Sequence, residues 1–139
     1  MRAKQELSSM DGFVEIIDRA LSSSEYYNLL FRADAVIIPY LHSGYYAQTS
    51  GIFAEAVALG RPVIVPQGTW MEREFEKYKS GGELFAIGDS ASLGRALLKF
   101  AEHPDESYLR AHVCRKKWVQ YHNPRNYVDV LLKIIGEGR

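Results

Sequence analysis

The fold is decided by the stretch SGIFAEAVALGRPVIVP, residues 50–66. Residues 51–59 are apolar apart from Glu55 and mostly small, and they end at Gly60, a residue that commonly terminates helices because it adopts the left-handed conformation easily. Residues 62–66 form a continuously apolar, β-branched run between two prolines, which cannot continue a neighbouring helix. The stretch therefore predicts a helix over 51–59 followed by a buried strand over 62–66.

Short apolar runs also lie on either side of this stretch. Residues 35–38 are continuously apolar and end at Pro39, residues 83–86 predict a short edge strand, and residues 13–17 predict a further strand near the N-terminus. Segments of helical period separate these runs. This alternation predicts an α/β fold, a Rossmann-like parallel sheet of about four strands covered by helices.

Helix starts are marked by polar motifs. Ser22 and Glu25 have the spacing of a capping box that opens a helix to residue 32. Thr69 and Glu72 repeat this spacing before a charged helix that should end near residue 79.

The C-terminal third reads as helix throughout, from residue 90 onward, with breaks at Pro104 and Pro124. A chain of 139 residues fits one domain of ordinary size. We therefore expect a single domain over 1–139, with an alternating part over 13–89 and helices over 90–139.

Composition narrows the classes of partner. Seventeen basic and seventeen acidic residues give a net charge of zero, which favours neither nucleic acid nor an anionic membrane surface. No apolar run approaches the ~20 residues of a membrane span, and the N-terminus is too polar for a signal peptide, so we expect a cytoplasmic protein. A single cysteine and four scattered histidines predict no metal site, and we expect no cofactor.

Glu55 is the only formally charged side chain between His42 and Arg61. A carboxylate in so apolar a helix should lie near the sheet and needs hydrogen-bond donors. A ribose would supply two hydroxyl donors, while its phosphates sit over the amides of Ser50, Gly51 and Ile52 at the helix N-terminus. Alternatively, Glu55 interacts only with the helix N-terminus or a neighbouring backbone amide.

Two further features border this candidate site. Tyr40, Tyr45 and Tyr46 precede the helix and either stack on a base or sugar or serve only as packing residues. Thr69 follows the strand over 62–66 at its carboxyl end, where it either reaches a ligand or only caps the next helix.

Residues 33–40 (ADAVIIPY) and 50–66 together resemble the C-terminal, donor-binding domain of GT-B glycosyltransferases. The likeness is strongest to the retaining group that uses nucleotide-activated sugars, and it extends weakly over residues 13–135. It implies a nucleotide-diphosphate sugar as ligand. It also implies that Glu55 binds the ribose hydroxyls and that residues 50–52 hold the diphosphate.

The chain departs from this family in two respects. Where the family often has a second Glu close to the transferred sugar, this sequence has Ala47, which leaves the sugar side to neighbours such as Gly44 and Tyr46. The family's first two strand–helix units, with a basic pair for the diphosphate, and its acceptor domain have no counterpart in this sequence. We therefore assign no catalytic residue, and expect glycosyl transfer only with a separate acceptor-domain polypeptide.

Two other functions remain open, and both involve the sheet. The chain could be a non-catalytic remnant or subunit that binds a partner polypeptide. A flavodoxin-like signalling domain would need an acidic pocket at the strand ends, but Asp34 precedes its strand. The expected strand over 13–17 must pair with residues 35–38 or with another chain, and the exposed edge or face left by either pairing predicts a homo-oligomer.

Overall fold

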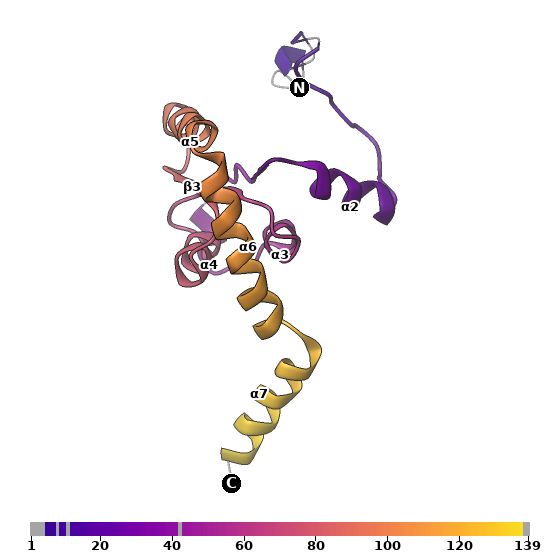
Figure 1. Ribbon diagram of the computed structural model, residues 1–139, viewed down its shortest axis with the longest axis vertical. Helices are drawn as coiled ribbons and strands as arrows, with labels where there is room; N and C mark the ends of the chain where they lie inside the picture. Colours follow the sequence, from indigo (N-terminus) through magenta and orange to yellow (C-terminus); the bar gives the residue numbers. More distant parts are fainter. Residues whose placement is uncertain (1–4, 8, 11, 42, 138–139) are drawn as a thin grey trace.

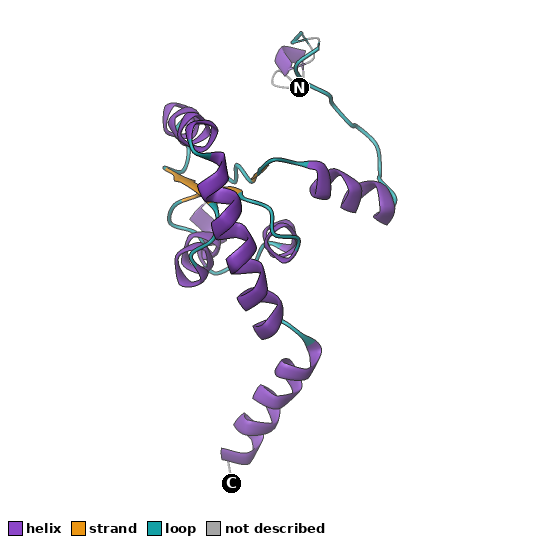
Figure 2. Ribbon diagram, viewed as in Figure 1, coloured by secondary structure: helices purple, strands orange, loops and turns teal. Residues whose placement is uncertain are grey.

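The computed structural model describes residues 5–7, 9–10, 12–41 and 43–137. Helices and strands alternate through the first two thirds of this range, and three helices follow (Figure 2). In chain order the elements are α2 (Ser23–Arg32), β1 (Val36–Ile37), the 3₁₀ helix η1 (Ser43–Tyr46), α3 (Gly51–Ala58), β2 (Val63–Pro66), α4 (Trp70–Tyr78), β3 (Gly82–Phe85), α5 (Ser90–Glu102), α6 (Pro104–Tyr121) and α7 (Pro124–Glu137). The α/β fold and the helical C-terminal third are confirmed.

The sheet is parallel, in the order β1-β2-β3, with β2 at its centre. Val36 lies beside Val63, and Val63 lies beside Gly82. The predicted strands over 35–38, 62–66 and 83–86 are therefore all present, and the last is an edge strand as expected.

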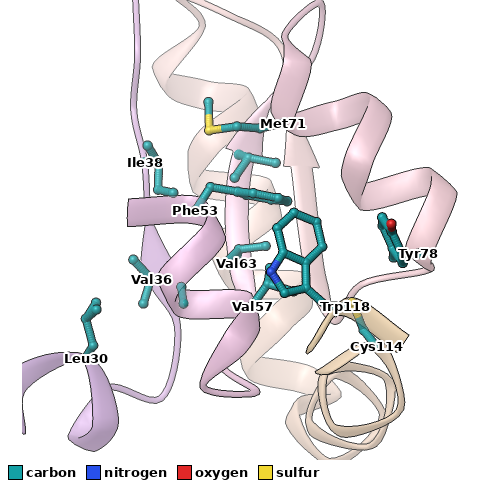
Figure 3. Packing of buried hydrophobic residues seen from close by; sticks show 12 residues of the cluster. Leu30, Val36, Ile38, Phe53, Val57, Val63, Met71, Tyr78, Cys114 and Trp118 are labelled. Atoms are coloured by element: carbon teal, nitrogen blue, oxygen red, sulfur yellow. The ribbon is translucent and has the colours of Figure 1, made fainter. Parts of the chain in front are cut away.

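The two faces of β2 pack into separate clusters because successive strand residues point to opposite sides. Val63 and Val65 face a cluster that includes Phe53 of α3, Met71 of α4 and Trp118 of α6 (Figure 3). Ile64 joins the second cluster, with Phe85, Ala96 and neighbours on α5. Helices thus cover both faces of the sheet around β2 and β3.

The larger cluster is built on aromatic contacts. Phe53 is fully buried and meets Trp118 edge to face, with 5.8 Å between ring centroids. Trp118 also meets Tyr78 at 5.1 Å, and Cys114 is buried one turn earlier on α6. The large apolar area of these rings accounts for much of the core, which ties α3, α4 and α6 together.

Gly82 allows β3 to lie against β2. Its φ is +113°, and a Cβ atom there would lie 1.9 Å from the carbonyl oxygen of Val63. Gly60 has φ +72° directly after α3, which confirms the predicted helix stop. Both positions need glycine, one for close approach and one for the turn.

The predicted capping box at the start of α2 is confirmed. Ser22 Oγ accepts the N–H of Glu25, and the Glu25 carboxylate accepts the N–H of Ser22 at 2.8 Å. The exposed guanidinium of Arg19 and the Ser22 donors lower the pKa of Glu25 to about 2.

The predicted strand over 13–17 is wrong. These residues pair with no described strand, and the Phe13 side chain is 90% exposed. An apolar run supplies the pattern of a strand, but a strand also needs a neighbour's backbone to complete its hydrogen bonds. The sheet of the described residues therefore has three strands instead of about four.

The terminal elements extend away from the sheet. In Figure 1, α7 runs from the end of α6 toward the C-terminus, and the segment before α2 joins that helix at the end farther from the sheet. None of α7's described side chains is buried. No helix among the described residues has the length and hydropathy to cross a bilayer.

Candidate functional site

The candidate site lies beyond the carboxyl ends of β1 and β2. Because these strands are parallel neighbours, the segments that follow them emerge at the same edge of the sheet. The first of these segments leads through η1 to α3, and the second reaches Thr69 and α4. Ligands of open α/β sheets collect at this edge.

Ser50 begins α3 and is 3% exposed. Its Oγ accepts the N–H of Phe53 at 3.4 Å, so its side chain caps the helix. The next two amide groups, of Gly51 and Ile52, donate to no described residue. Gly51 is exposed, and a Cβ there would have no atom within 4 Å, so the helix N-terminus opens on unfilled space.

Glu55 lies one turn into α3 and is half-buried. Tyr26 of α2 donates its hydroxyl to Glu55 Oε2 at 2.5 Å. Glu55 Oε1 accepts from no described residue. The carboxylate is therefore neither in bulk water nor paired with a basic side chain, and it retains acceptor capacity for further hydroxyl groups.

The contact with Glu55 also changes the chemistry of Tyr26. The pKa of Tyr26 is raised to about 12, mainly because the phenol is partly buried and secondly because it donates a hydrogen bond to the Glu55 carboxylate. Tyr26 therefore remains a neutral hydroxyl donor throughout the physiological range.

Two tyrosines of the preceding loop pack together. The rings of Tyr40 and Tyr45 stack at 4.1 Å between centroids, and Tyr40 Oη lies 3.4 Å from Ser50 Oγ. These two rings support the start of α3. Of the three tyrosines, Tyr46 presents the most exposed ring, at 63%.

Arg73 of α4 reaches this loop. Its guanidinium lies 4.4 Å from the centroid of the Tyr46 ring, a distance typical of a cation–π contact. Gly44, in the same 3₁₀ turn as Tyr46, is exposed. The structure thus places a positive charge beside the loop.

Thr69 is 1% exposed, and its hydroxyl is fully engaged. It donates to the carbonyl oxygen of Pro66 at 2.8 Å and accepts the N–H of Glu72 at 3.4 Å. In a capping box the Glu72 carboxylate would accept the N–H of Thr69. It instead accepts the N–H of Gly68, one residue earlier, at 2.7 Å. In this arrangement Thr69 caps α4.

The structure thus brings Ser50, Gly51, Ile52 and Glu55 together on α3, with Gly44 and Tyr46 in the preceding turn and Thr69 at the neighbouring strand end. Sequence reasoning missed Tyr26 as the partner of Glu55 and Arg73 as the cation beside Tyr46. Tyr26 shares an apolar helix face with Leu30, so its pattern indicates packing alone. Arg73 lies in a charged helix and carries no distinguishing signal.

A further hollow lies outside the candidate site. A hollow of about 550 Å³ lies at the junction of α6 and α7, between Tyr121 and Val130, and is lined mainly by apolar surface. Among the described residues no group of three or more His, Cys, Asp or Glu side chains is placed to hold a metal ion.

Comparison with known proteins bears on the fold. No family model and no curated protein matches the sequence. Among solved structures, the chain is similar to sucrose-phosphate synthase from Thermosynechococcus elongatus, with a TM-score of 0.73 and 16% sequence identity. The match covers 99% of this chain and 34% of that one. The chain therefore has the fold of part of a GT-B glycosyltransferase, as the sequence resemblance predicted.

Proposed function

We propose that this chain is a glycosyltransferase-like domain that binds a nucleotide-diphosphate sugar beside the N-terminal half of α3. The ribose hydroxyls donate to Glu55, and the diphosphate lies over the amides of residues 50–52. Transfer of the sugar then requires an acceptor domain as well.

The observation that carries this proposal is the environment of Glu55. A half-buried carboxylate is costly unless donors surround it, and Tyr26 is its one described donor. Two vicinal hydroxyl groups match the acceptor capacity that remains on the two oxygens. A ribose has this pair of donors, whereas a simple phosphate would be repelled by the charge.

The second support is the helix N-terminus one turn away. The N–H groups of Gly51 and Ile52 donate to no described residue, and together with the positive end of the α3 dipole they favour an anion at this position. Arg73 stands beside the loop and can add a positive charge toward a diphosphate. Tyr46 offers an exposed ring face on which a sugar or base can stack.

A second candidate is a non-catalytic module that binds a partner polypeptide. It is favoured by α7, in which seven large hydrophobic side chains are at least 39% exposed. Such a face usually marks an interface.

Titration of the full-length chain with UDP, GDP and their sugars distinguishes the two candidates. We expect saturable amide shifts in NMR spectra, centred on α3 and the loop before it, for at least one of these ligands. The absence of any shift at millimolar ligand would instead favour the interaction module.

A further inference from the structure

The outer side of β1 is open. The N–H groups of Val36 and Ile38 donate to the carbonyl oxygens of Pro62, just before β2, and of Ile64, within β2, at 2.9 and 3.0 Å. Because alternate residues of a parallel strand direct their backbone groups to opposite sides, those of Ile37 point away from β2. No described residue pairs with them, and the Ile37 side chain is 42% exposed. The sheet thus ends in a usable template for another strand.

Residues 13–17, which we call the N-terminal arm, pair with no described strand, although the N–H groups of Phe13 and Val14 donate to the carbonyl oxygen of Met10. Phe13, Ile16 and Ile17 in this arm are 90%, 37% and 38% exposed. The backbone of residues 15–17 forms no hydrogen bond with a described residue. Figure 1 shows the chain before α2 joining that helix at the end farther from the sheet.

The packing of α2 keeps the arm away from its own sheet. Leu30 is buried in the larger cluster, and the hydroxyl of Tyr26 donates a hydrogen bond to Glu55 on α3. The arm precedes the capping box at Ser22, at the opposite, N-terminal end of this helix. With α2 in this position the arm is free to reach another molecule.

The accessible surface area of the chain is larger than a compact monomer of its mass would expose. It measures 9926 Å², whereas a compact monomer of 15.8 kDa exposes about 7,300 Å². The excess of roughly 2,600 Å² exceeds the ~800 Å² that each partner buries in a standard interface. The net charge of zero places no overall repulsion between two copies.

We propose that two copies of this chain exchange N-terminal arms, each arm adding as a fourth strand to β1 of the other copy. A second copy can supply both partners, since each chain has one arm outside the sheet and one open strand edge. In a two-fold arrangement, the arm and the β1 edge of each chain pair with those of the other chain, so no further copy can add and the assembly is closed. This interface does not depend on the proposed nucleotide site.

Light scattering after size exclusion, on the full-length chain at micromolar concentration, tests the assembly. We expect twice the monomer mass of 15.8 kDa. Ile16→Pro removes one strand donor and one apolar contact, so it should weaken dimerisation about tenfold or more without lowering the helix content. Ser23→Pro is the matched control, because it places proline at the first position of α2, where proline is tolerated. A monomeric wild-type chain, or a dimer unaffected by Ile16→Pro, would overturn the proposal.

Cysteine crosslinking tests which segments meet. Mixing an Ile16→Cys chain with an Ile37→Cys chain should give a disulfide-linked dimer under mild oxidation, while the buried native Cys114 stays unreactive. If Ile37→Cys alone crosslinks, two β1 edges meet instead. If a chain carrying both substitutions closes only within itself, the arm pairs with its own sheet. Either of these results would overturn arm exchange.

Discussion

The hydroxyl of Tyr26 donates a hydrogen bond to the carboxylate of Glu55, 29 residues away in sequence. This contact joins α2 to α3 and holds the Glu55 side chain beside the helix N-terminus. A ligand bound as proposed would meet a carboxylate of defined orientation, which favours binding because less side-chain freedom is lost.

Tyr26→Phe should lower the free energy of unfolding by about 1 kcal/mol, because it leaves a half-buried carboxylate without its described donor. Its effect should depend on pH. The folded pKa of about 12 lies above the ordinary value near 10, so the phenol's contribution is complete below pH 10 and disappears as pH rises toward 12. Urea unfolding of both proteins at neutral and alkaline pH measures this. If the free energy of unfolding fell equally in the wild-type chain and in Tyr26→Phe above pH 10, this predicted pH dependence would be contradicted.

Gly82→Ala should destabilise the chain by about 3 kcal/mol or more, since the new Cβ would overlap the carbonyl oxygen of Val63. Gly88→Ala is the matched control. Gly88 also has a positive φ, +74°, but a Cβ there would have no atom within 4 Å, so only about 1 to 2 kcal/mol of backbone strain is expected. Thermal unfolding followed by circular dichroism compares the two. Similar losses from both substitutions would argue against the close approach of β3 to β2.

Cys114 should report unfolding of the core. Its side chain is fully buried, and burial raises the pKa of its thiol, so the native protein should not react with a thiol reagent at neutral pH. Reaction should begin only as urea unfolds the chain, in parallel with the change in fluorescence of Trp70 and Trp118. Rapid labelling without denaturant would show that α6 is not held against α3 and α4.

Local sequence signals predicted the helices and their ends. Ser22 with Glu25, Gly60 and Pro104 each act within a few residues, so their hydrogen bonds and allowed dihedral angles can be inferred from neighbours alone. Likewise, the β-branched residues and flanking prolines of the apolar run over 62–66 indicated a buried strand between helices.

Features that depend on distant partners escaped prediction. The arm over 13–17 has the pattern of a strand, but pairing requires a neighbour that the pattern cannot supply. Tyr26 and Arg73 reach the candidate site only because α2 and α4 pack near the loop and α3. The position of Glu55 in a sparsely charged stretch did single it out, because an acid in an apolar helix is conspicuous in any sequence.

The central claim is that Glu55 receives the hydroxyl groups of a nucleotide ligand, and calorimetric titration of the full-length chain with UDP- and GDP-sugars tests it most directly. We predict saturable binding by the wild-type chain, weakened about tenfold to a hundredfold in Glu55→Ala because charge-assisted hydrogen bonds are lost. Glu76→Ala, which removes an exposed carboxylate from α4, should leave the affinity unchanged. Binding that persists undiminished in Glu55→Ala, or no heat from any of these ligands at millimolar concentration, would contradict the account.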